Sequence, residues 1–149
     1  MKLKLKAVSP KVGTDIPFPS RGTSGSAGLD LMACLDQPVV ISPRQLVRIP
    51  TGIAIALPGP EYVALVFARS GLGIKHGISL SNGVGVIDSD YRGEIQVGLT
   101  NLSHTPYTVQ PGDRIAQLVV TPVVTPEVEV VEELEDTDRG TGGFGSTGR

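Results

Sequence analysis

Apolar and polar residues alternate with a period of two over much of the chain. Lysine and leucine alternate from Lys2 to Lys6, and similar alternation recurs over residues 52–57 and 94–100. Because successive side chains of a strand point to opposite faces, this pattern predicts strands. Apolar and β-branched runs predict further strands at residues 39–41, 45–49, 62–67, 115–120 and 128–131. We therefore expect an all-β chain of at least about ten short strands, arranged as a sandwich, jelly roll or barrel.

A helical period is nearly absent. The one short helix that the sequence predicts lies around Ser70 to His76, where nearby glycines limit it to a turn or two. The composition agrees, because 19 Gly and 12 Pro are spread through 149 residues. Each Gly or Pro penalises a helix interior, by about 1 and 3 kcal/mol respectively.

The length of the chain suits one domain with a short appendage. We predict a β-barrel domain over residues 1–138 and a flexible arm over residues 139–149, which contain five glycines. Residues 127–138 hold seven acidic residues and no basic one. A final strand from Glu127 to Leu134 would leave an edge that could pair with a neighbouring subunit.

Charge and composition exclude several partner classes. The net charge is −2, and the eleven basic and eight acidic residues of 1–126 are too balanced for a nucleic-acid surface. No run approaches the roughly 18 apolar residues of a membrane span, and the N-terminus lacks the apolar block of a secretory signal. We therefore expect a cytoplasmic protein without a membrane or nucleic-acid partner. The lone Cys34 excludes an internal disulfide and a thiolate metal cluster.

A glycine-rich turn at residues 68–77 is a candidate anion site. Its glycines allow successive backbone N–H groups to point at one place, and the start of a short helix adds a positive end. Arg69, Ser70 and Gly71 open this turn. A surface turn with a solvated arginine is the alternative interpretation.

Two strand-like segments carry further polar candidates. Asp30 alternates with leucines in residues 27–33, so its side chain points away from theirs, which also suits a plain surface carboxylate. Residues 111–120 begin with a Pro-Gly-Asp turn and continue as a strand. Arg114 and Gln117 differ by three positions and lie on opposite faces of a regular strand. A β-bulge would be needed to aim both at one ligand.

The segment from Asn82 to Gly93 is predicted to form a β-hairpin, with an apolar run, an Asp-Ser-Asp turn and a following strand. The backbone donors and acceptors of a hairpin can read the edge of a planar base. Asp88 ends the apolar run and is a candidate general base, while Tyr91 could cover a sugar or base face. Asp88 and Asp90 are also compatible with a purely turn-forming role.

The glycine-rich segment from Arg139 to Gly148 combines a guanidinium group, several hydroxyl groups and one aromatic ring. Such a segment suits a cluster of phosphates, and Phe144 suits a stacked ring. A loose tail is the alternative.

In this order and spacing, the five segments resemble the motifs of the all-β, homotrimeric deoxyuridine triphosphate nucleotidohydrolase (dUTPase) family. The matching spans cover 58 of 149 residues, at 27–33, 68–78, 82–101, 111–120 and 139–148. The resemblance implies a jelly-roll-like distorted β-barrel and a homotrimer whose active sites lie at subunit interfaces, each closed by a neighbour's arm. It also implies Mg²⁺-dependent hydrolysis of dUTP to dUMP and pyrophosphate, which lowers dUTP and supplies dUMP for thymidylate synthesis.

The resemblance also implies roles for individual residues. Asp88 resembles the general base that activates water for attack on the α-phosphorus. Tyr91 matches the residue under the deoxyribose, where it crowds out a ribose 2′-OH, and Asp30 matches a carboxylate near the metal's waters. The implied uracil readers are Asn82, Val86 and Ile87; the implied phosphate contacts are Arg69, Ser70, Gly71 and Gln117; and the implied arm contacts are Arg139, Phe144, Gly145, Ser146 and Thr147.

Two other functions are compatible with parts of this pattern. The dCTP deaminase family is similar in fold, but its pattern places a catalytic Glu about three residues before an Asn. Here Gly98 holds that position before Asn101, which disfavours deamination. A non-catalytic dUTP-binding trimer is expected to lack the base or the arm, and both are present in this sequence.

Overall fold

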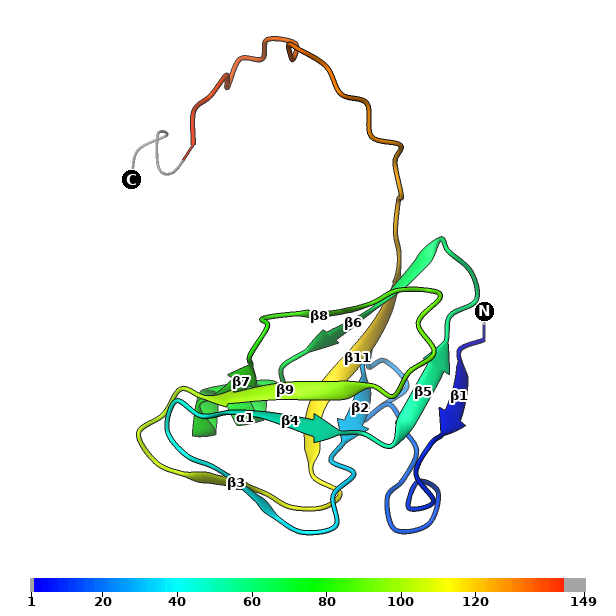
Figure 1. Cartoon of the computed structure of the whole chain (residues 1–149), viewed down its shortest axis with the longest axis vertical. Helices are drawn as coiled ribbons and strands as arrows, with labels where there is room; N and C mark the ends of the chain where they lie inside the picture. The colour runs from blue at the N-terminus through cyan, green and yellow to red at the C-terminus, as the bar shows by residue number, and fades with distance from the viewer. Residues whose placement is uncertain (1, 144–149) are drawn as a thin grey trace.

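The chain folds almost entirely into short strands. The computed structural model describes residues 2–143, which contain eleven strands and one helix (Figure 1). The strands are β1 (Lys4–Ala7), β2 (Leu29–Met32), β3 (Val39–Ile41), β4 (Leu46–Pro50), β5 (Ile53–Ala56), β6 (Tyr62–Phe67), β7 (Ile78–Leu80), β8 (Gly85–Ile87), β9 (Gln96–Asn101), β10 (Tyr107–Val109) and β11 (Arg114–Pro122). The prediction of an all-β jelly-roll fold is confirmed. No helix within residues 2–143 is long and apolar enough to cross a membrane.

Four sheets enclose one core. The largest has the strand order β2-β11-β6-β8, and a three-stranded sheet has the order β4-β9-β7. The pairs β1-β5 and β10-β3 complete the fold, and all these pairings are antiparallel. The alternation predicted for the strands places their apolar faces inside. The largest fully buried apolar side chains are Leu31, Ile41, Ile49, Ile53, Ile78, Leu99, Ile115, Leu118, Val97 and Val109.

The helix α1 (Ser70–His76) occupies the range that the sequence predicts. It ends at Gly77, which adopts a left-handed conformation with φ of 67° and donates its amide hydrogen to the carbonyl of Gly73. A Cβ atom at Gly77 would lie 3.0 Å from the backbone nitrogen of Ser103. Glycine is therefore required at this helix end for both conformation and space.

One buried polar side chain organises the turn after β9. The amide of Asn101 donates to the carbonyls of Ile41 and Thr105, each at 2.8 Å. Its oxygen accepts from the backbone nitrogen of Ser103 at 2.9 Å and from the hydroxyl of the same residue at 2.7 Å. Asn101 is completely buried, and these four hydrogen bonds offset the cost of removing its amide from water.

The predicted final strand from Glu127 to Leu134, and with it the strand at 128–131, does not form within the single chain, and its pairing with a neighbouring subunit stays a prediction. Strand β11 ends at Pro122, and residues 123–143 contain no strand. Val128 and Val130 are 90% and 93% exposed. Figure 1 shows the segment leaving the barrel after β11. An alternating pattern alone does not form a strand, because its backbone groups need a neighbouring strand to bond with.

The predicted hairpin over Asn82–Gly93 is also wrong in its pairing. Strand β8 pairs with β6, where Ile87 lies opposite Ala64. Strand β9 instead lies between β4 and β7. The two strands expected to pair therefore belong to different sheets, and the loop between them bridges those sheets.

Candidate active site

A first cavity, of about 220 Å³, opens where β8 and β9 diverge. All five residues predicted for the base, the sugar and the catalytic base line it: Asn82, Val86, Ile87, Asp88 and Tyr91. Sequence reasoning missed the opposite wall, which β9 supplies with Gln96 and Gly98. Strand β7 reaches only as far as Leu80, opposite Leu99, so the preceding part of β9 extends past this partner. The backbone nitrogen of Ser81 still donates to the carbonyl of Gly98 at 3.0 Å, so this bonding continues as far as Gly98.

Asp88 and Tyr91 lie on one turn at the cavity's edge. The backbone nitrogen of Tyr91 donates to the carbonyl of Asp88 at 3.2 Å. Arg92 stabilises the same turn, because its guanidinium donates to the carbonyls of Ser89 at 2.8 Å and Tyr91 at 2.9 Å. Within residues 2–143 the Asp88 carboxylate forms no hydrogen bond and is exposed. The backbone therefore holds the turn, and the carboxylate is available for chemistry.

The Tyr91 ring lies across Gly93. A Cβ atom on Gly93 would lie 2.6 Å from Cζ of the ring, so only glycine fits beneath it. The Tyr91 hydroxyl donates to the carbonyl of Glu94 at 2.9 Å. These contacts fix an aromatic ring at the mouth of the first cavity, although the side chain stays 45% exposed.

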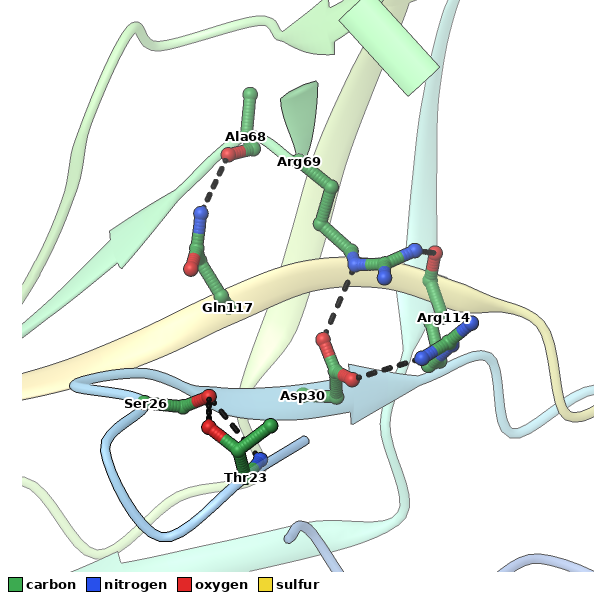
Figure 2. Close-up of polar contacts among 7 residues, drawn as sticks. All are labelled: Thr23, Ser26, Asp30, Ala68, Arg69, Arg114 and Gln117. Atoms are coloured by element: carbon green, nitrogen blue, oxygen red, sulfur yellow. Dashed lines mark hydrogen bonds and ion pairs between the residues drawn. The ribbon is translucent and has the colours of Figure 1, made fainter. Parts of the chain in front are cut away.

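A second cavity, of about 400 Å³, lies at the junction of β2, β11 and the turn before α1 (Figure 2). It unites the residues predicted for the phosphates with the predicted metal-site carboxylate: Arg69, Ser70, Gly71, Gln117 and Asp30. A Cβ atom on Gly71 would meet nothing within 4 Å, so this part of the wall is open to a ligand.

Asp30 joins two arginines in this cavity. Its Oδ1 lies 3.0 Å from Nε of Arg69, and its Oδ2 lies 3.4 Å from Nη1 of Arg114, as Figure 2 shows. Nη1 of Arg69 also donates to the backbone carbonyl of Arg114 at 3.3 Å. The Asp30 side chain is only 17% exposed, so it is not the plain surface carboxylate of the alternative interpretation. Two arginines and one aspartate leave an excess of positive charge, which suits phosphates.

Gln117 and Gly28 form another part of the wall of the second cavity. Nε2 of Gln117 donates to the carbonyl of Ala68 at 3.0 Å (Figure 2). A Cβ atom at Gly28 would lie 2.7 Å from Oε1 of Gln117, so Gly28 makes room for this amide. Sequence reasoning assigned no role to Gly28 and did not select Arg114. A β-bulge that would turn Arg114 and Gln117 toward one ligand was the feature that could have indicated Arg114.

The described part of the predicted arm, residues 139–143, lines neither cavity within this chain. Nε of Arg139 donates to the carbonyl of Gly142 at 2.9 Å, within the segment that leaves the barrel. The predicted site residues Phe144, Gly145, Ser146 and Thr147 lie outside the described residues.

The donor set argues against a metal site made by protein ligands alone. No group of three or more His, Cys, Asp or Glu side chains converges within residues 2–143. Among the described residues, Asp30 is the one acidic residue lining the second cavity, and both of its oxygens face guanidinium groups. A magnesium ion that keeps several waters and is carried on a ligand's phosphates would not need such a cluster of protein ligands.

The two cavities differ in chemistry and share no lining residue. The first carries Asp88 and Glu94, whereas the second carries Arg69 and Arg114 with Asp30. A single chain thus presents one wall suited to a nucleoside and another suited to phosphates, at separate places.

A protein-family model described as dUTPase matches residues 14–148. The chain belongs to the dUTPase family. It is 53% identical over 148 residues to the deoxyuridine 5'-triphosphate nucleotidohydrolase of Idiomarina loihiensis, covering 99% of this chain and 98% of the relative. The enzyme of the same name from Escherichia coli O9:H4 (strain HS) is 49% identical, with coverage of 99% and 98%.

Solved dUTPase structures share the fold. The dUTPase of Staphylococcus bacteriophage 80alpha with dUPNHPP has a TM-score of 0.86 and 29% identity, covering 99% of each chain. A mutant dUTPase from phage phi11 of S. aureus, described with a structural Mg(II) ion, has a TM-score of 0.78 and 26% identity, covering 91% of this chain and 100% of that one. The family and the relatives establish the present dUTPase as a hydrolase of dUTP.

Proposed function

We propose that this dUTPase cleaves dUTP to dUMP and pyrophosphate at sites formed between subunits of a homotrimer. One observation carries the proposal: the predicted nucleoside residues and the predicted phosphate residues line two cavities without a common wall. One dUTP molecule must contact both sets. A cyclic arrangement allows the first cavity of one subunit to face the second cavity of the next.

The first cavity would hold the nucleoside. Asn82 and the backbone beside Val86 and Ile87 offer donors and acceptors to the edge of uracil, and Val86 and Ile87 belong to a strand that the β6 pairing holds in place. The Tyr91 ring would lie under the deoxyribose. A 2′-OH would then meet the ring, which disfavours ribonucleotides by crowding.

Asp88 would act as the general base. Its carboxylate takes a proton from a water molecule while the water oxygen bonds to the α-phosphorus and the bond from that phosphorus to the bridging oxygen of pyrophosphate breaks. General-base assistance of this kind typically contributes about 10²- to 10⁴-fold to the rate. Support comes from the free, exposed position of Asp88 directly after β8.

The second cavity would bind the phosphates. Arg69 and Arg114 supply charge, and Ser70 and Gly71 supply the start of α1, where backbone amides lack helical partners. Gln117 holds the carbonyl of Ala68 and thereby braces this turn. Magnesium carried on the phosphates would offset their negative charge, and Asp30 would hold its waters.

The arm over residues 139–149 is proposed to close a neighbour's site, with Arg139, Ser146 and Thr147 at the γ-phosphate and Phe144 and Gly145 over uracil. Closure of this kind excludes water from the reaction. Division of the chain into a barrel of residues 1–138 and this arm, and a cytoplasmic location, stay predictions.

Complementation between inactive variants tests the shared site. We would inactivate the first cavity with Asp88→Asn and the second with Arg69→Ala, then mix equal amounts through denaturation and refolding. In a trimer with sites between subunits, about a quarter of the sites regain both intact residues. A site formed within one chain predicts no recovery, which would overturn the proposal. Refolding each variant alone is the control, and light scattering checks the trimer.

A substrate panel tests the reaction itself. With Mg²⁺, we expect dUMP and pyrophosphate from dUTP, and little turnover of dCTP, dTTP or UTP, resolved by chromatography. Formation of dUTP or dUMP from dCTP would instead indicate deamination.

A further inference from the structure

The loop that carries Asp88 and Tyr91 is anchored separately at its two ends. At its start, β8 pairs with β6, which fixes the backbone just before Asp88. Because β8 and β9 do not pair, a different anchor must hold the half of the loop that carries Tyr91. That anchor is Glu94, together with the residue after it.

Glu94 binds the barrel through its side chain. Oε1 accepts a hydrogen bond from the backbone nitrogen of Gly52 at 2.8 Å, and Oε2 accepts one from Nε2 of Gln96 at 3.3 Å. Gly52 is buried in the turn between β4 and β5 and has a φ of 70°. Its carbonyl in turn accepts from the backbone nitrogens of Val8 and Ser9. A carboxylate bonded to a buried amide makes a strong, charge-assisted contact.

The neighbouring backbone reinforces this anchor. The nitrogen of Ile95 donates to the carbonyl of Ile53 at 2.9 Å. Thr51 donates to the carbonyl of Ile95 from its nitrogen at 3.2 Å and from its hydroxyl at 2.6 Å. Gly52 thus holds the side chain of Glu94, while Thr51 and Ile53 hold the backbone of the next residue, Ile95.

The backbone of the same residue holds the aromatic ring. The Glu94 carbonyl accepts the hydroxyl of Tyr91 at 2.9 Å, and Gly93 leaves space for the ring. Glu94 therefore connects a buried turn of the barrel with Tyr91, the one aromatic side chain among residues 2–143 that lines the first cavity.

We propose that Glu94 is a positioning residue that holds Tyr91 in place and thereby sets discrimination against ribonucleotides. The inference rests on the proposed role of Tyr91 beneath the sugar. Glu94 acts through Tyr91 and not on the reacting atoms, so it affects binding and selectivity more than the chemical step. Asp88 shares a backbone hydrogen bond with Tyr91 but follows Ile87, whose pairing with Ala64 of β6 is a separate anchor.

Steady-state kinetics with dUTP and UTP test the proposal. In Glu94→Ala we expect KM for dUTP to rise several-fold, kcat to stay within about twofold, and the ratio of kcat/KM for dUTP over UTP to fall on the order of tenfold. Glu94→Gln keeps an oxygen that can accept from Gly52, so it should retain most of the selectivity. Ile41→Val, in the core of the β3-β10 pair, controls for general loss of stability and should leave the ratio unchanged.

A double-mutant cycle separates positioning from a merely structural role. Once Tyr91→Ala has removed the ring, adding Glu94→Ala should lower the selectivity ratio no further. If Tyr91→Ala loses selectivity but Glu94→Ala keeps it, the proposed role of Glu94 is wrong and the role of Tyr91 stands. If Tyr91→Ala itself keeps the wild-type ratio, the assignment of Tyr91 and the inference about Glu94 both fail. Calorimetric titration with dUMP and UMP gives the same comparison without turnover.

Discussion

Arg114 and Gln117 lie three positions apart on β11, yet both line the second cavity. Strand β11 shifts its register against β2 between Arg114 and Ala116, and this bulge turns both side chains to one face. The irregularity allows Arg114 to reach Asp30 while Gln117 braces the turn at Ala68. A regular strand would place one of the two on the opposite face.

Asp88→Asn should lower kcat for dUTP on the order of 10²-fold or more, because an amide cannot take the proton from water. The change keeps the shape of the side chain, so the Kd for dUTP, measured by calorimetry, should change only a few-fold. Asp90→Asn, two positions further along the same turn, is the matched control and should retain normal turnover. Unchanged kcat in Asp88→Asn would dismiss it as the base.

Asp30→Asn should release Arg69 and Arg114 from their shared carboxylate. We expect kcat/KM for dUTP to fall roughly tenfold, and the free energy of unfolding in urea to fall by about 1 kcal/mol, since hydrogen bonds to a charged group are lost. Asp36→Asn is the control, because Asp36 pairs with Lys11 while its side chain is 87% exposed. Such exposed pairs contribute little, so this variant should behave like the unchanged protein.

Gly28→Ala should disturb the second cavity through Gln117. The new methyl group would lie 2.7 Å from Oε1 of Gln117, so the amide must move away from Ala68. We expect a several-fold loss of kcat/KM for dUTP, on the scale of about 1 kcal/mol of transition-state stabilisation. Gly25→Ala lies in the same loop with nothing within 4 Å of the new atom, and it should be neutral. Equal effects from both changes would contradict the bracing role.

Asn101→Ala should destabilise the fold without acting on the site directly. It removes the partners of the buried Ile41 carbonyl, of the part-buried Thr105 carbonyl and of Ser103, and we expect a loss of about 3 kcal/mol in urea unfolding. Asn82→Ala gives the converse result, because Asn82 is exposed and lines the first cavity. It should leave stability intact and raise KM for dUTP.

Removal of residues 139–149 should leave the barrel folded, since described contacts of the core end with β11 and Val123. We expect an unchanged urea midpoint and a loss of kcat/KM on the order of tenfold or more, because the site can no longer exclude water. Arg139→Ala in the full chain separates the guanidinium from the rest of the arm. Full activity of the shortened protein would remove the arm from the mechanism.

The sequence by itself determined the fold class and the range of α1, and it named several of the residues that line the two cavities. Period-two alternation indicates which face of a strand is buried, and the positions of glycines indicate where a helix ends. Both features can therefore be predicted from a short stretch of sequence. Residues predicted for the nucleoside gather in one cavity, and those predicted for the phosphates up to Gln117 gather in another.

Only the tertiary structure decided which strands pair and which side chains support the site. The pairing of β8 with β6 and not with β9 follows from packing between distant segments, which no local pattern specifies. The valines of 127–134 carry a strand pattern but meet no strand within residues 2–143. The role of Glu94 could not be predicted from the sequence either, because its hydrogen-bond partner Gly52 lies 42 residues away in the chain. Local alternation specifies burial, whereas hydrogen-bond partners are chosen by the whole fold.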